Sequence, residues 1–158
     1  MLALHARKST ILLAIVTAVL LLLSTFFSPL QADAAQSKSQ KAVSYSKKLV
    51  NSPYKWGGTS PKGFDASGFT QYVFSKSVAK KLPRTSADQY KTGTSIAKNK
   101  LKAGDLVFYK TDGKKVSFVA IYIGNNKFIG ATSKGVKTQS MNLDYWKKRN
   151  GGAKRVVN

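Results

Sequence analysis

The residues best placed to do chemistry lie in the stretch 65–69, DASGF, where a loop rich in glycine and proline leads into an apolar helix. Asp65 or Ser67 is the expected N-cap of that helix, because each side chain can accept a hydrogen bond from a free backbone N–H group. The N-terminus of a helix carries partial positive charge, which stabilises a nucleophilic thiolate. Ala66 stands where such a thiolate would be, so the sequence indicates a site without the chemistry suited to it.

The residue types exclude several kinds of catalysis. The chain has no cysteine, its only histidine is His5, and residues 35–158 contain no glutamate. Residues 35–158 therefore cannot use Cys/His or Ser/His/Asp catalysis, and they lack the imidazole and thiolate ligands that zinc prefers. Their aspartates do not show the spacing of a calcium or magnesium loop. We expect no metal and no cofactor, and a Ser–Lys dyad or an Asp–Asp pair is the remaining catalytic option.

The N-terminal region has the pattern of an export signal. Arg7 and Lys8 precede an apolar run over 11–27, and the small-residue sequence 32–34 follows it. This pattern predicts a secretory signal peptide over 1–34, with secretion or a cell-wall location for the rest of the chain. The alternative is an uncleaved segment that anchors the protein, because the apolar run is only slightly shorter than a membrane span. We expect no other contact with a membrane.

The chain is strongly basic, with 27 lysines and arginines against six acidic residues and a formal net charge of +21. A solvated surface that keeps the protein soluble is one explanation. Attraction to a polyanion is the other, and for an exported protein the available polyanions are wall teichoic acids, anionic lipid headgroups and nucleic acid. The sequence contains no helix-turn-helix, zinc-finger or ribonucleoprotein motif, so we expect no specific nucleic-acid partner.

Apolar periodicity divides the chain after the signal into a short linker over 35–41 and one domain over 42–158. Helical spacing predicts helices over about 39–51 and 66–80, with a shaped loop rather than a strand over 53–64. Short apolar runs separated by turn residues predict strands at 105–110, 116–123, 127–132, 136–141 and 153–157. Helices followed by consecutive hairpins indicate an α+β fold with a mainly antiparallel sheet.

Six sequence motifs follow one another along this domain. They are PYKWGG at 53–58, KGFDASGF at 62–69, LPRTSADQY at 82–90, AGDLVFY at 103–109, VAIYIGNNKFIGAT at 119–132 and YWKKR at 145–149. In combination they resemble the NlpC-type cell-wall endopeptidases, papain-like cysteine peptidases that cut the stem peptide of peptidoglycan. The resemblance implies a papain-like fold. It also implies peptidoglycan stem peptides or anionic wall polymers as partners, and an active cell-wall hydrolase as a further one.

The same resemblance implies a degenerate catalytic site. The family places its nucleophilic cysteine at the position of Ala66, its histidine base at Phe118, and a polar residue that orients the imidazole at Gly130. Ala66 has no nucleophile, Phe118 has no lone pair to take a proton, and Gly130 has no side chain. Three coordinated losses are typical of a natural pseudoenzyme, so we expect no catalytic residue at these positions.

Seven residues at other motif positions are candidates for substrate binding: Tyr54, Trp56, Asp65, Ser67, Arg84, Ser86 and Gln89. By the resemblance, Tyr54 and Asp65 would meet the amino end of the stem peptide, and Arg84 would hold a peptide carboxylate with its planar fork. The alternative roles are structural. The two aromatic residues would pack around a tight loop, Asp65 and Ser67 would cap a helix, and Phe118 would fill core space where the cleft had been.

These observations favour an exported, wall-binding pseudoenzyme. Two other functions stay open. One is an active cell-wall hydrolase that uses unconventional catalytic groups. The other is a secreted cationic protein that binds polyanions or membranes through charge alone.

Overall fold

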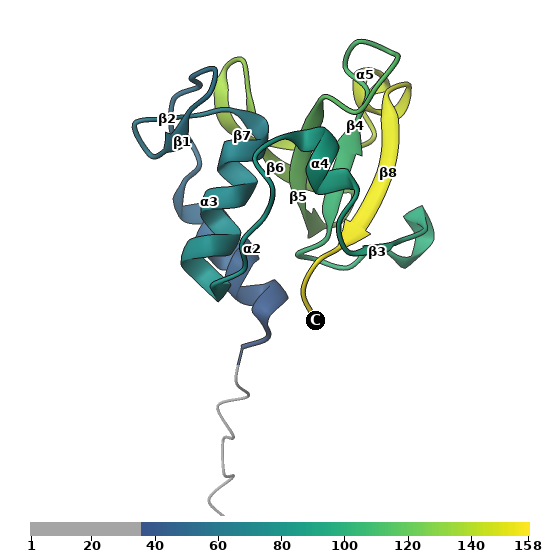
Figure 1. Ribbon diagram of the computed structural model, residues 1–158. Helices are drawn as coiled ribbons and strands as arrows, with labels where there is room; N and C mark the ends of the chain where they lie inside the picture. Colours follow the sequence, from purple (N-terminus) through teal and green to yellow (C-terminus); the bar gives the residue numbers. More distant parts are fainter. Residues whose placement is uncertain (1–35) are drawn as a thin grey trace, which may run out of the picture. The chain divides into compact units, whose positions relative to one another are not determined.

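Two helices open the described part of the chain, which covers residues 36–158 of the computed structural model (Figure 1). The first, α2 (Lys38–Lys48), begins at a capping box: the Ser37 hydroxyl accepts a hydrogen bond from the backbone N–H of Gln40, and the Gln40 side chain accepts one from the N–H of Ser37. This helix begins inside the stretch 35–41, so the linker is shorter than predicted. The second, α3 (Ala66–Val78), matches the predicted helix over 66–80.

The predicted signal peptide over 1–34 lies outside the described residues. Within the described residues, no helix has the length and the apolar character needed to cross a membrane.

The loop predicted to hold no strand contains a small antiparallel hairpin of β1 (Thr59–Ser60) and β2 (Gly63–Phe64). The prediction was wrong here because strands of two residues leave no periodic pattern in a sequence. A close backbone approach shapes the hairpin, since a Cβ added at Gly58 would collide with the carbonyl oxygen of Gly63. The hairpin delivers the chain directly to the first turn of α3 (Figure 1).

A six-stranded sheet forms the second half of the domain, and each strand pairs antiparallel with its neighbours in the order β3-β8-β4-β5-β6-β7. The strands are β3 (Thr94–Ser95), β4 (Leu106–Tyr109), β5 (Phe118–Gly124), β6 (Lys127–Thr132), β7 (Gly135–Ser140) and β8 (Asn150–Arg155). Short helices α4 (Ser86–Tyr90), η1 (Lys98–Lys100) and α5 (Asp144–Lys147) lie in the connections. The fold is therefore α+β, as predicted, although the short edge strand β3 was missed.

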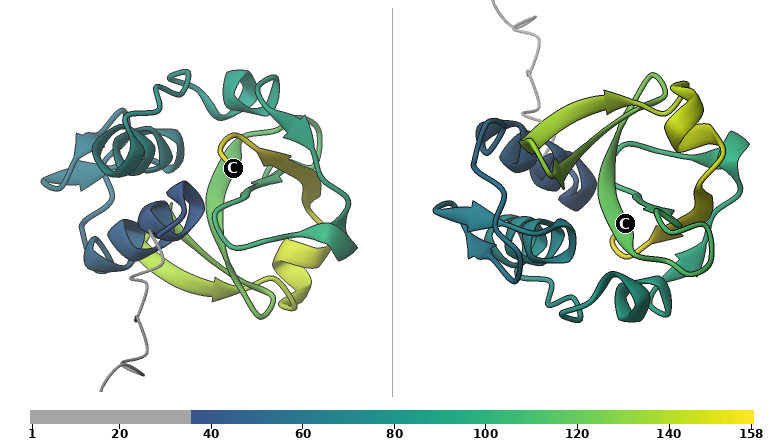
Figure 2. Two further views of the ribbon diagram at one scale, coloured as in Figure 1. Left: turned by 90° about the horizontal axis from the view of Figure 1, so that it is seen from below. Right: turned by 90° about the horizontal axis from the view of Figure 1, so that it is seen from above.

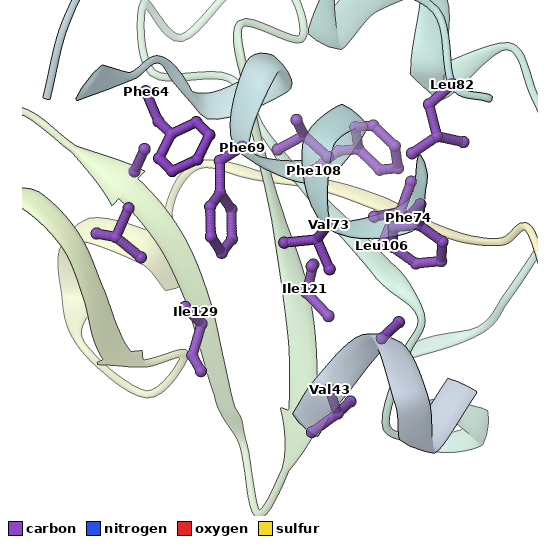
Figure 3. Packing of buried hydrophobic residues seen from close by; sticks show 14 residues of the cluster. Val43, Phe64, Phe69, Val73, Phe74, Leu82, Leu106, Phe108, Ile121 and Ile129 are labelled. Carbon is purple, nitrogen blue, oxygen red and sulfur yellow. The ribbon is translucent and has the colours of Figure 1, made fainter. Parts of the chain in front are cut away.

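The sheet has a buried cluster on each face, because successive strand residues point to opposite sides. On one face α2 and α3 lie side by side (Figure 2), and Phe69 and Val73 of α3 pack near Ile121 and Ile129 of the sheet (Figure 3). The other face carries a second cluster that includes Trp146 of α5. Residues 36–158 thus form one compact unit with cores of their own.

An ion pair links the start of β4 to the end of β8, its neighbour in the sheet. Arg155, at the end of β8, donates to both carboxylate oxygens of Asp105 at 2.7 and 2.8 Å, and Asp105 also accepts from the backbone N–H of Lys102. The side chain of Asp105 is only 2% exposed. Asp105 therefore has a structural role, and the sequence could not identify a partner 50 residues away.

Candidate functional site

A cleft of about 820 Å³ lies at the N-terminal end of α3. The loop before β1 and the connector before α4 border it, together with the turn between β4 and β5 and the helix α5; the right panel of Figure 2 looks onto this edge of the domain. Eight predicted positions line it: Tyr54, Trp56, Asp65, Ala66, Ser67, Arg84, Ser86 and Phe118. Phe118 therefore does not close the cleft.

Asp65 is the centre of a polar network at one end of the cleft. It is the N-cap of α3, and its Oδ1 accepts from the backbone N–H of Gly68 at 2.7 Å. Arg84 binds the same carboxylate with both terminal nitrogens, Nη1 to Oδ1 at 3.0 Å and Nη2 to Oδ2 at 2.5 Å. Arg84 Nη1 also donates to the Ser67 hydroxyl at 3.0 Å, and Gly57 N–H donates to Asp65 Oδ2 at 3.1 Å. Both carboxylate oxygens are thus satisfied within the protein.

These contacts decide the charge state of the network. Burial raises the pKa of Asp65, but the hydrogen bonds from Arg84 and Gly68 and the positive charge of Arg84 outweigh burial and hold that pKa below its usual range. The hydrogen bond to Asp65 in turn raises the pKa of Arg84. Asp65 is therefore ionised at neutral pH and already neutralised. The fork of Arg84, predicted to hold a peptide carboxylate, instead holds this aspartate.

The loop that carries Trp56 is tied to the same network. The backbone N–H of Asp65 donates to the carbonyl of Gly58 at 3.0 Å, and Gly57 donates to the Asp65 side chain. A Cβ added at Gly68 would collide with the carbonyl oxygen of Gly58, so the loop and the first turn of α3 are in direct contact. The tie holds Trp56 at the cleft with 87% of the residue exposed. Trp56 is thus a rim residue rather than a core residue.

The floor of the cleft has a different character. Ala66 is the first residue of α3, and Phe118, 8% exposed, is the first residue of β5. The Phe118 ring packs against Trp146 and Phe128 with centroid separations of 5.0 and 6.0 Å. Tyr109 packs in the same cluster, and its buried hydroxyl finds no hydrogen-bond partner among the described residues. The surroundings of the floor are therefore apolar, and Phe118 is both core filling and cleft lining.

Gly130 and Phe118 fit one another in size. A Cβ added at Gly130 would lie 3.0 Å from Cζ of Phe118 and 2.8 Å from Cβ of Ala120. The phenyl ring thus occupies the space that a side chain at position 130 would use. The resemblance assigns the base and its orienting residue to these two positions, and here they form one packed unit.

Gln89, predicted to bind substrate, does not line the cleft. It is fully buried; its Oε1 accepts from the Thr70 hydroxyl at 2.8 Å, and its Nε2 donates to the carbonyls of Ser67 and Pro83. Each of its polar groups is occupied in joining α3 to the connector that carries Arg84. Gln89 therefore positions the polar network without facing a ligand.

Sequence reasoning missed the wall opposite this network. Lys115, Tyr145 and Trp146 line it, and the backbone N–H of Lys110 donates to the carbonyl of Arg149 at 2.7 Å, which joins the β4–β5 turn to the segment after α5. The motif YWKKR marked this segment but gave no location for it. Among the described residues, no group of three or more acidic or histidine side chains comes together as a metal site would require.

Known proteins with similar sequences include cell-wall enzymes. The model of the NlpC/P60 family matches residues 51–155. Murein DD-endopeptidase MepH of Escherichia coli is 40% identical over 136 residues, which are 80% of this chain and 50% of that protein. Probable peptidoglycan endopeptidase LytE of Bacillus subtilis is 49% identical over 116 residues, 73% of this chain and 34% of that protein. The chain thus spans half or less of the length of these two relatives.

Solved structures agree with the sequence comparisons. An NlpC/P60 family protein from Bacillus cereus superposes with a TM-score of 0.71 at 34% identity, over 76% of this chain and 40% of that one. The NlpC/p60 domain of the peptidoglycan hydrolase SagA superposes with a TM-score of 0.66 at 32% identity, over 75% of this chain and 98% of that domain.

Proposed function

The chain belongs to the NlpC/P60 family, and we propose that it is an exported, wall-associated pseudoenzyme that binds peptidoglycan stem peptides in its cleft without cleaving them. The observation that carries this proposal is the contrast within one cleft. The cleft is open and keeps its polar rim, while the positions that the resemblance assigns to nucleophile and base hold Ala66 and Phe118. The relatives named as peptidoglycan endopeptidases support peptidoglycan as the ligand.

Ser67 directly follows the nucleophile position in the chain, and its surroundings argue against a substitute role. Its Oγ accepts from Arg84 at 3.0 Å and contacts Asp65 Oδ1 at 3.3 Å. A serine nucleophile needs a base that removes its proton, whereas a guanidinium keeps its protons and the ionised Asp65 is held by Arg84. The polar contacts of Ser67 therefore serve the network.

A single incubation with purified sacculi tests the proposal. The protein without its predicted signal, residues 35–158, is mixed with sacculi at physiological salt, and both the pellet and the released fragments are analysed. We expect the protein in the pellet and no fragments in the supernatant. Released stem-peptide fragments would establish an active hydrolase with unconventional groups, and protein that stays in the supernatant would exclude wall binding.

Matched variants separate cleft binding from binding by charge. Trp56→Ala removes an exposed aromatic side chain that lines the cleft, and Leu143→Ala removes an exposed apolar side chain, 50% exposed, that does not. We expect the first change to weaken binding to sacculi and the second to leave it unchanged. Equal binding by both variants, with a steep fall at high salt, would instead favour the cationic protein that binds any polyanion.

Export is a separate part of the proposal, supported by the pattern of residues 1–34 alone. Mass spectrometry of the protein recovered from the producing cells tests it. A chain that begins at residue 35 supports cleavage and release, and an intact N-terminus in the membrane fraction supports the anchored alternative.

A further inference from the structure

The charged groups of the cleft are few, and their balance is uneven. Among the residues that line it, only Asp65, Arg84 and Lys115 carry a full charge at neutral pH. Asp65 and Arg84 neutralise one another through the two-pronged contact described above. Among the lining residues, Lys115 is therefore the one whose charge has no ion-pair partner in the lining.

Asp65 has no capacity left for a ligand ammonium group. Its Oδ1 accepts from Gly68, Arg84 and Ser67, and its Oδ2 accepts from Arg84 and Gly57. A carboxylate has about four lone-pair positions, so these five contacts exhaust it. A positively charged peptide end would meet Arg84 beside an already occupied acid. The amino-end role that the resemblance implied for Asp65 is therefore not supported by its contacts.

Lys115, by contrast, is available. It is exposed, and none of the ion pairs in the described part of the chain includes it. Its backbone N–H and that of Lys114 both donate to Asp112 Oδ1, at 3.1 and 2.9 Å, which fixes the turn on which it stands. These hydrogen bonds, together with the nearby charge of Lys115, hold the pKa of Asp112 below its usual range, so an ionised carboxylate outside the cleft lining lies near Lys115. Residues 147–149 follow Trp146 and add positive charge near this wall without lining the cleft.

Several of the other lining residues are apolar, and the hydroxyl residues Thr111, Ser117, Thr132 and Ser133 line the cleft as well. Ala66, Val116, Phe118, Ala131 and Trp146 line it without offering a hydrogen-bonding side chain in position to receive charge, except for the indole N–H of Trp146. A charged group placed over this floor would lose hydration without compensation. The arrangement suits a ligand whose middle is uncharged and whose negative group reaches the wall of Lys115.

We propose that the cleft selects acidic peptides, with Lys115 as the residue that binds the ligand's carboxylate. This inference rests on the proposed function and deepens it. The carboxylate has two sources in a stem peptide, the free C-terminus and an acidic side chain. The chemistry that Lys115 recognises is the same in both cases, because an ammonium group acts as a point charge without a preferred fork.

The test uses a synthetic stem tetrapeptide in three forms: both carboxylates free, the C-terminus amidated, and the side-chain carboxylate amidated. Binding to the protein without its signal, residues 35–158, is measured by calorimetry or NMR titration. We expect one amidated form to bind about twofold to fivefold more weakly than the free acid, as for one solvent-exposed charge pair. The form that loses affinity identifies the source of the carboxylate.

Variants assign the effect to one lysine. Lys115→Gln is expected to abolish the difference in affinity between the free and amidated peptides, and Lys115→Arg is expected to keep it. The control Lys114→Gln removes an equal charge from the same turn, outside the cleft lining, and is also expected to keep the difference. Equal binding of all three peptide forms by the unaltered protein would overturn the selection and leave cleft binding intact. Absence of binding by every form would overturn both proposals. Equal loss from Lys115→Gln and Lys114→Gln would replace the site with a diffuse charge effect.

Discussion

The rim and the floor of the cleft meet at the sequence neighbours Asp65 and Ala66 and differ in what holds their residues in place. At the rim, Asp65 caps α3, binds Arg84 and anchors the preceding loop, so the fold needs it whether or not a ligand binds. On the floor, Ala66 and Phe118 do no more than pack. The difference teaches that the fold needs a motif residue with a structural role whether or not the protein catalyses a reaction. Retention of Asp65 is therefore not by itself a sign of substrate binding.

The largest effect should come from the floor. Phe118→Ala removes a ring that is 8% exposed and packs against Tyr109, Phe128 and Trp146. We expect the free energy of unfolding to fall by about 3–5 kcal/mol, toward the lower end because the cleft lets water enter the space. Urea unfolding followed by tryptophan fluorescence measures it. A loss below about 1 kcal/mol would mean that the floor is not part of the core.

Gly130→Val should destabilise the protein by a smaller amount, about 1–3 kcal/mol, because the new side chain overlaps Phe118 and Ala120. The double variant with Phe118→Ala sharpens the interpretation. The cost of the valine should shrink once the ring is gone, by at least about 0.5 kcal/mol of coupling. Strictly additive losses would show that the two positions do not share one space.

Changes at the rim should cost less. Asp65→Ala removes the N-cap and the partner of Arg84, and we expect a loss of about 1–2 kcal/mol, mostly from the cap because Arg84 is 40% exposed. Asp65→Asn keeps a capping acceptor and removes the charge, so its smaller loss isolates the ion pair. The comparison of rim and floor fails if Asp65→Ala destabilises the protein more than Phe118→Ala does.

The smallest effect is the pH dependence of the ion pair. The pKa of Asp65 is lower in the folded protein than the value of about 3.9 expected when unfolded, so its contribution is complete above that pH and is lost as the pH falls through the folded pKa. The stability difference between the unaltered protein and Asp65→Asn should be constant from about pH 7 to 5 and should shrink below about pH 4. Urea unfolding at each pH tests this, and a difference that grows on acidification would contradict it.

Local sequence patterns were enough to predict most of the helices and strands. The helix α3 follows from an apolar run behind a capping aspartate, and β5 and β6 follow from apolar runs separated by turn residues. The motif positions also placed most of the cleft residues. The hairpin of β1 and β2 was missed, because its short strands are held by one close backbone approach between glycines.

Side-chain partners were much harder to predict than elements. Arg84 reaches Asp65 across 19 residues, and Arg155 reaches Asp105 across 50. Nothing local to either arginine encodes its partner, because both contacts arise only when separate elements are packed. The same reason explains Gln89: its motif position was recognised, but its burial beneath the connector depends on how α3 and α4 meet.

The loop anchored to Asp65 has a consequence for the thermodynamics of binding. Trp56 stands on a backbone fixed by hydrogen bonds from Gly57 and to Gly58, so a ligand meets an aromatic surface whose main chain is already ordered. Ordering a flexible loop on association would oppose binding through lost conformational entropy, and here that loss has already occurred during folding. Association should therefore require little rearrangement of the loop.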